Sequence, residues 1–171
     1  METVESIRAG DSWRRRLEGL YAAEYPSVVK LAYLLTGERD AAEDVAQEAF
    51  VRLFARFQDR KEPEVVGAYL RRIVVNLSRS RVRRLVNDRR KIERAASLPQ
   101  PPEADPVSPA LTRELLMRLP VRQRAALYLR YYEGRSERET AEALGCSIGA
   151  VKSLVMRAAR TVRSEEGGRD G

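Results

Sequence analysis

Histidine is absent from this sequence of 171 residues. Without it there is neither a Ser-His-Asp triad nor a zinc site built on imidazole. The single cysteine excludes an intramolecular disulfide, and no signal peptide or membrane-spanning apolar run is recognisable, so we expect a cytoplasmic protein. We also expect no catalytic activity of its own, no metal or other cofactor, no small-molecule substrate and no membrane contact.

The positive charge is concentrated in two zones. The net charge is +7, which favours a polyanionic partner such as nucleic acid. Residues 71–94 carry ten basic and two acidic groups, and residues 111–166 carry eleven and seven. Residues 1–70 are acidic, with ten basic and thirteen acidic groups. This uneven distribution of charge along the sequence indicates two separate basic surfaces and one acidic surface.

Five of the eight prolines fall between Leu98 and Pro109. Proline at this density excludes a helix and is typical of a linker. The sequence on both sides is rich in helix-forming residues with apolar positions at helical spacing. We therefore expect an all-α protein of two small helical domains. The expected division is an N-terminal extension (1–16), a first domain (17–95), a linker (96–110), a second domain (111–166) and a tail (167–171).

The first domain is predicted to hold three helices. The first runs from Leu17 to Leu35 and ends at the Thr36-Gly37 pair, and Asp40 is a suitable N-cap for the second. The third begins near Glu64 and continues into the arginine-rich zone. Apolar residues recur at three- and four-residue steps in the second helix and predict its buried face: Ala42, Val45, Ala46, Ala49, Phe50, Leu53 and Phe57.

A polar face is predicted on the third helix, opposite its apolar stripe. Its spacing suits contact with a phosphate backbone, and Asn76 can donate to and accept from a base edge at once. The alternative is a solvated arginine face without a ligand. The residues that share the face are Arg72, Asn76, Arg79, Ser80 and Arg83.

An acidic cluster opens the second helix. Its carboxylates could in principle hold Mg²⁺, but the helix macrodipole already favours acidic residues there and no phosphate-binding loop accompanies them. A docking face for a basic protein partner is the better interpretation. The cluster consists of Glu38, Asp40, Glu43, Asp44 and Glu48.

The second domain has the pattern of a helix-turn-helix. Pro120 is predicted at the first position of a helix that Gly134 ends. Ser136 and Glu139 form a capping box for a new helix, which ends at Gly145, and Ser147 caps the final basic helix. The positions that this motif must bury or keep small are all suitable: Ala141, Leu144, Gly145, Cys146, Val151 and Leu154.

The outward positions of the final helix suit a DNA major groove. Lys and Arg can bond guanine or phosphate there, and Ser can serve either. The alternative is a helical hairpin with a solvated basic face. The outward residues are Ser147, Ile148, Gly149, Lys152, Ser153, Met156 and Arg157, with Arg160 further along the same basic helix.

Four elements in this order resemble the extracytoplasmic-function (ECF) sigma factors of bacterial RNA polymerase. They are LAYLLTGERDAAEDVAQEAFVRLF, VGAYLRRIVVNLSRSRVRR, the proline linker, and LPVRQRAALYLRYYEGRSERETAEALGCSIGAVKSLVMRAARTVR. Together they cover roughly Leu17 to Arg163. The resemblance implies a promoter-specificity subunit that binds core RNA polymerase and promoter DNA, recognises the −35 and −10 elements and melts the −10 region. An anti-sigma factor is a further partner for which the resemblance leaves room.

The resemblance also implies a role for each surface. The segment from Asp40 to Phe57 would dock on the clamp helices of the largest subunit, and the second domain would rest on the flap of the second-largest. The docking residues would be Asp40, Asp44, Gln47, Glu48 and Arg52. The −10 element would meet Arg60 and Lys61, in a loop that captures a flipped base, and Arg72, Asn76, Arg79, Ser80 and Arg83. The −35 element would meet Ser136, Ser147, Gly149, Lys152, Ser153, Met156, Arg157 and Arg160.

Two positions depart from the family pattern. Members often carry Trp where this chain has Tyr69, and Asp where it has Ser80; both leave the preferred −10 base open. A conventional helix-turn-helix regulator that acts without polymerase is the alternative function, although such regulators need a dimerisation surface to match half-sites. An all-helical interaction protein is a second alternative, and the DNA-reading register disfavours it.

Overall fold

The computed structural model describes residues 2–57, 63–93 and 109–167, and all of its regular elements in these ranges are helices. The N-terminal module consists of α1 (Glu2–Thr36), α2 (Arg39–Arg56) and α3 (Pro63–Glu93). The C-terminal module consists of α4 (Pro109–Arg118), α5 (Val121–Leu127), the π-helix η1 (Tyr128–Tyr132), α6 (Glu137–Leu144) and α7 (Ile148–Gly167). The expected all-α class is confirmed.

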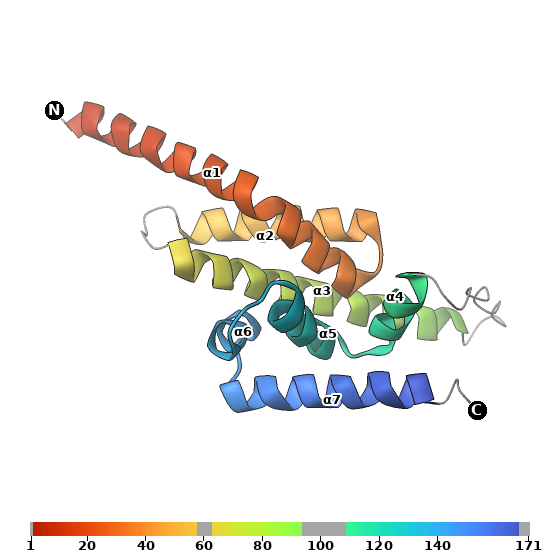
Figure 1. Cartoon of the computed structure of the whole chain (residues 1–171). Coiled ribbons are helices and arrows are strands. Elements are labelled where there is room, and N and C mark those ends of the chain that lie inside the picture. The colour runs from red at the N-terminus through yellow and green to blue at the C-terminus, as the bar shows by residue number, and fades with distance from the viewer. Residues whose placement is uncertain (1, 58–62, 94–108, 168–171) are drawn as a thin grey trace.

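The helices form layers (Figure 1). In the N-terminal module α1 crosses α2 and α3, and α4, α5 and α6 lie between α3 and α7. One continuous apolar core extends through both modules, from Val28 and Phe50 to Leu129 and Val151. The two modules are therefore packed against each other.

The predicted apolar stripe of α2 is buried, and its alanines let α1 and α3 approach closely. Phe50, 2% exposed, is the largest side chain of this core. Its ring lies 4.8 Å from that of Tyr21 and 5.6 Å from that of Phe54, between centroids. Phe57, predicted to be buried, is half-buried and packs at the edge of the core.

Several helix ends differ from the predicted ones. The first helix begins at Glu2 rather than Leu17, and α4 begins at Pro109, inside the predicted linker. Asp40 is not an N-cap: Glu38 has the extended cap conformation, and Asp40 lies in the first turn. Asp40 is inside the helix because Gly37, at φ 79°, reverses the chain sharply, so that α2 already starts at Arg39.

Pro120 precedes its helix instead of opening it. Pro120 has an extended backbone with ψ 143°, and its carbonyl accepts hydrogen bonds from the N–H groups of Gln123 and Arg124 at 2.9 and 3.1 Å. The helix therefore begins at Val121. It continues as η1 and stops before Gly134, whose φ of 65° confirms the predicted end.

Candidate nucleic-acid interface

The helix-turn-helix is formed by α6, the turn at Gly145 and α7. The capping box is present, since the Ser136 hydroxyl accepts from the Glu139 N–H at 3.1 Å and the Glu139 carboxylate accepts from the Ser136 N–H at 2.7 Å. These bonds from Ser136 lower the pKa of Glu139. Gly145 has φ 61°, and the Ser147 hydroxyl accepts from the N–H of Ala150 at 3.1 Å. All three local predictions are confirmed.

The buried positions of the motif agree with the predicted register. Ala141, Leu144 and Val151 are at most 5% exposed. Cys146 was expected in the core and is half-buried, and like Leu154 it packs against the core from its edge. The motif thus fixes which side of α7 faces outward.

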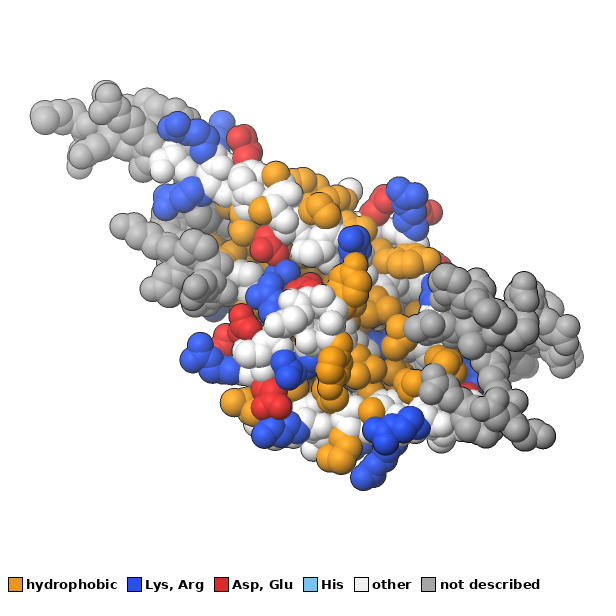
Figure 2. All heavy atoms as spheres, in the orientation of Figure 1, with side chains coloured by type: hydrophobic (Ala, Val, Ile, Leu, Met, Phe, Trp, Pro, Cys, Tyr) orange, Lys and Arg blue, Asp and Glu red, His pale blue; other side chains and the backbone are white. Residues whose placement is uncertain are grey.

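The outward side of α7 is basic. Lys152, Arg157 and Arg160 are exposed, and Met156 is 53% exposed between them. Figure 2 shows Lys and Arg side chains with apolar ones between them along the edge of the molecule that α7 forms. The Lys152 ammonium lies 3.6 Å from the Glu137 carboxylate in an exposed ion pair. Of the other candidates for −35 contact, Ser136, Ser147 and Gly149 are exposed and Ser153 is half-buried.

The predicted polar face of α3 lies at the surface, and one of its residues, Arg72, also contacts the C-terminal module. Asn76, Arg79 and Arg83 are exposed and Ser80 is half-buried. Arg72 is exposed as well, but it packs over the turn of the helix-turn-helix, where a Cβ atom on Gly145 would lie 2.7 Å from its Nε. Arg60 and Lys61 lie outside the described residues.

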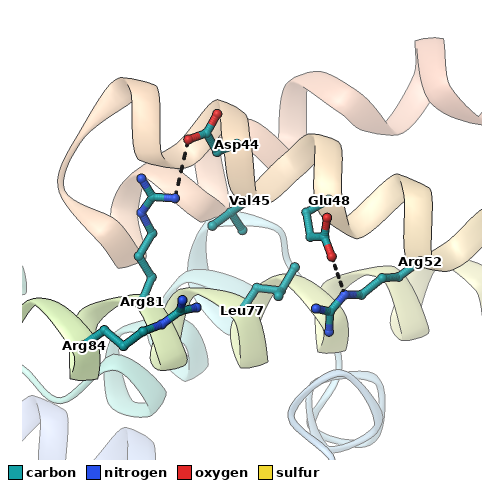
Figure 3. A pocket seen from close by; sticks show the side chains of 7 residues that line it. All are labelled: Asp44, Val45, Glu48, Arg52, Leu77, Arg81 and Arg84. Atoms are coloured by element: carbon teal, nitrogen blue, oxygen red, sulfur yellow. Dashed lines mark hydrogen bonds and ion pairs between the residues drawn. The ribbon is translucent and has the colours of Figure 1, made fainter.

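The predicted docking surface on α2 is exposed and carries both signs of charge (Figure 3). Asp44 Oδ2 lies 3.4 Å from a guanidinium nitrogen of Arg81, and Glu48 Oε1 lies 2.7 Å from Nε of Arg52. Between α2 and α3 these residues line a groove of about 180 Å³. Asp40 and Gln47 are also exposed. The acidic cluster is therefore partly neutralised by arginines, and no metal-binding group of acidic or cysteine side chains occurs among the described residues.

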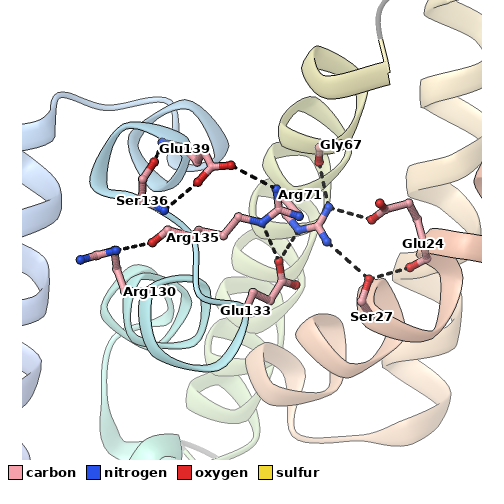
Figure 4. Close-up of polar contacts among 9 residues, drawn as sticks. All are labelled: Glu24, Ser27, Gly67, Arg71, Arg130, Glu133, Arg135, Ser136 and Glu139. Carbon is pink, nitrogen blue, oxygen red and sulfur yellow. Dashed lines mark hydrogen bonds and ion pairs between the residues drawn. The ribbon is translucent and has the colours of Figure 1, made fainter.

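Arg71 is a buried cation that the sequence analysis missed (Figure 4). Its side chain is 4% exposed and donates to Glu24 of α1 at 2.8 Å and to Glu133 at 2.6 Å. Burial lowers the pKa of Arg71, but the two carboxylates outweigh burial and the net pKa is raised. A signal was available: Arg71 lies on the buried stripe of α3, four residues after Gly67 and three before Val74.

Arg124 is a second buried arginine, and it is bonded to backbone rather than to carboxylates. It donates to the carbonyls of Leu119 at 3.1 Å and Leu34 at 2.9 Å, at the ends of α4 and α1. Burial lowers the pKa of Arg124. Helix C-termini carry partial negative charge, so this cation stabilises two of them at once.

The comparisons with known proteins agree with this geometry. Residues 20–88 match the model of sigma-70 region 2, and residues 110–162 match that of sigma-70 region 4. The RNA polymerase sigma-E factor of Streptomyces coelicolor is 36% identical over 135 residues, covering 75% of this chain and 73% of that protein. The ECF RNA polymerase sigma factor SigM of Mycobacterium tuberculosis is 34% identical over 162 residues, covering 92% and 79%.

A solved structure shares the fold. It is the sigma factor RpoE of Bartonella quintana in complex with the anti-sigma factor NepR, with a TM-score of 0.70, 22% identity, and coverage of 88% of this chain and 96% of that one. The chain belongs to the sigma-70 family of transcription initiation factors. Within this family it is an ECF sigma factor, which directs core RNA polymerase to promoters by recognising the −35 and −10 elements.

Sigma factors as a class act through the polymerase they bind rather than through a reaction of their own. None of the helices in the described ranges is both long and apolar enough to cross a bilayer.

Proposed function

We propose that this sigma factor divides its task among the three surfaces described above. The α2 surface binds the clamp helices of core polymerase, the polar face of α3 opens the −10 region, and the outward side of α7 reads the −35 element as duplex. The chain contributes no catalysis, because the chemistry belongs to its partner, and it works in the cytoplasm with the polymerase.

The observation that carries this proposal is that one chain exposes all three surfaces on separate helices. A conventional helix-turn-helix regulator needs only the α7 surface and a dimerisation surface. The exposed arginines of α3 and the docking groove of α2 have no use in that alternative. Both are explained by a protein that binds polymerase and melts DNA.

The α3 surface suits single-stranded DNA. Arg79 and Arg83 lie one turn apart and can follow the phosphate backbone, while Asn76 can bond a base edge. A base drawn out of its stack costs a few kcal/mol, which such contacts must offset.

The α7 surface suits the major groove. Lys152 and Arg157 can bond guanine or phosphate, and Ser147 and Gly149 near the start of the helix allow close approach of the backbone. The same module would rest on the polymerase flap. An anti-sigma factor, like the one bound to the Bartonella relative, is a further proposed partner.

The docking surface is tested by reversing its charge. In the double variant Asp44→Lys, Glu48→Lys, co-elution with purified core polymerase should fall at least several-fold. Folding should be kept, because the two ion pairs that are lost are exposed and each stabilises by at most about 1 kcal/mol. Glu18→Lys, an exposed reversal on α1, is the matched control. If the double variant co-elutes as well as the native chain, the α2 surface is not the docking site.

A further inference from the structure

Two large apolar side chains are exposed on the outward side of α7. Ile148 is 43% exposed and Met156 is 53% exposed. Lys152 lies midway between them, so the three side chains follow one edge of the helix at four-residue steps. We call Ile148 and Met156 the apolar edge of α7. Single exposed apolar residues are common on protein surfaces, but two in register on a helix that binds a ligand indicate an apolar contact in the complex.

The packing of α7 fixes the apolar edge in its outward position. Val151 and Ala158 of the same helix are buried, and α7 packs on α5 and α6. Helix α7 is the outermost helix of its module (Figure 1). In the described part of the chain, its opposite side therefore faces solvent and is open to a partner.

The apolar edge carries little net charge compared with the rest of the outward side. Its one cation, Lys152, lies 3.6 Å from the Glu137 carboxylate. Arg157 and Arg160 are exposed further round the helix. The Arg160 guanidinium also lies 3.8 Å from the sulfur of Met156 and so helps to hold that side chain at the surface. Because phosphates attract cations, a nearly neutral apolar edge suits base edges inside a groove better than the DNA backbone.

Gly149, beside the apolar edge, is not explained by packing within the chain. Among the described residues, a Cβ atom at this position would meet only the Ser147 hydroxyl, at 3.9 Å. The backbone of Gly149 is not left-handed either. Alanine would fit there and would favour the helix, since glycine lowers helix stability. Close approach of another molecule to the start of α7 explains the glycine.

Thymine is the base that offers an apolar group to such a helix. In the major groove every base presents hydrogen-bonding groups, and thymine adds its C5 methyl group. A thymine methyl is thus the apolar contact that duplex DNA can give to an isoleucine or methionine side chain. The eight residues from Ile148 to Met156 span about 12 Å of helix, which corresponds to about four base pairs at about 3.4 Å each.

We propose that Ile148 and Met156 each contact the methyl group of a thymine, and that this sigma factor therefore selects −35 elements with two thymines within about four base pairs. The thymines can lie on either strand. Lys152 lies over the base pair between them, where it can bond a guanine. The proposal rests on the −35 function proposed for α7 and gives that surface a sequence preference.

The test replaces thymine by uracil, which removes the methyl group and keeps every hydrogen-bonding group of the base. Holoenzyme made from core polymerase and the native chain first selects a −35 element from a promoter library. Each thymine of that element is then replaced in turn by deoxyuridine, and holoenzyme binding is measured by fluorescence anisotropy in competition. Two of the replacements should each weaken binding about four-fold, the factor expected for one buried methyl group.

The variants Ile148→Ala and Met156→Ala link each thymine to a side chain. Each variant should bind the thymine promoter several-fold more weakly and should no longer distinguish thymine from uracil at one of the two positions. Arg157→Ala, which removes an exposed cation away from the apolar edge, is the matched control. It should weaken binding but keep both thymine preferences. Circular dichroism should show native helix content in all three variants, because the side chains are exposed.

Equal binding of native holoenzyme to the thymine and uracil promoters would overturn the proposal, as would a selected −35 element without two thymines in this window. Thymine preferences that survive in both Ile148→Ala and Met156→Ala would overturn it as well. If those variants also bound core more weakly, the apolar edge would be a protein contact. Failure of the sigma function would appear at the first step, because native holoenzyme would then select no promoter sequence.

Discussion

Arg122 of α5 donates to the carbonyl of Leu144 at 3.1 Å and so ties the last residue of α6 to the helix in front of it. Carbonyls at a helix C-terminus lack partners within the helix and favour a cation nearby. The bond fixes the turn from which α7 departs. Arg122 is therefore a positioning residue of the helix-turn-helix although it is not on the α7 surface.

Replacing Arg122 should weaken binding to −35 DNA, although none of the outward side chains of α7 is changed. In Arg122→Gln we expect a loss of about 1 kcal/mol of stability from the missing hydrogen bond, and a several-fold weaker binding to a −35 duplex selected by the native holoenzyme. Binding to core polymerase should be unchanged, because Arg122 lies outside the α2 surface proposed to dock on it. Thermal unfolding and fluorescence anisotropy measure the two effects. Duplex affinity equal to that of the native chain would show that the turn is fixed without Arg122.

The capping box gives α6 a defined response to acid. Because the pKa of Glu139 is lowered in the folded chain, its stabilising effect is fully present above the ordinary pKa of a glutamate and is lost as the pH falls through the lowered value. Helix content of the native chain should fall in that acidic range, and Glu139→Gln should make this part of the pH profile flatter. Ser136→Ala should cost about 1 kcal/mol near neutral pH. A pH profile identical in native chain and Glu139→Gln would contradict this account of the α6 terminus.

The α7 surface is tested by Lys152→Ala and Arg157→Ala. Each should weaken −35 duplex binding, and each phosphate contact removed should lower the salt slope of log K by about one. Binding to core should persist, because both side chains are exposed. Arg39→Ala, an exposed arginine on α2, serves as the control for duplex binding. Simultaneous loss of core and duplex binding would indicate misfolding instead of a lost contact.

The N-terminal core depends on Phe50. Truncation in Phe50→Ala should destabilise the chain by about 3–5 kcal/mol, since it removes a buried ring from an aromatic cluster. The adjacent Val51 is 62% exposed, so Val51→Ala should change stability by no more than about 0.5 kcal/mol. Denaturant unfolding of both variants checks the difference, and equal effects would place Phe50 outside the core.

Local chemistry made the helix-turn-helix predictable. Ser136 and Glu139 satisfy each other's backbone donors within four residues, and Gly145 supplies the one left-handed conformation that the turn needs. The buried apolar stripe of α2 was also predictable from the spacing of its apolar residues, because a buried helix face repeats with the helix period. These features depend on neighbours in the sequence, so the sequence alone contains the information.

The buried arginines depend on distant partners and were not predicted. Arg71 donates to Glu133, which lies 62 residues away in the sequence, and Arg124 donates to the carbonyl of Leu34, which lies 90 residues away. Nothing near either residue indicates which carboxylate or carbonyl will satisfy it. For the same reason the charge pattern predicted an acidic docking surface, whereas Arg81 of α3 supplies a cation to it from another helix.

The central claim is that this chain gives core polymerase its choice of promoter. Run-off transcription with purified core polymerase, the native chain and a library of random promoter sequences tests it most directly. The account predicts transcripts that start at defined positions, downstream of shared −35 and −10 sequences, and only when the chain is present. Absence of such transcripts, together with dimeric binding of the chain to palindromic DNA, would contradict it.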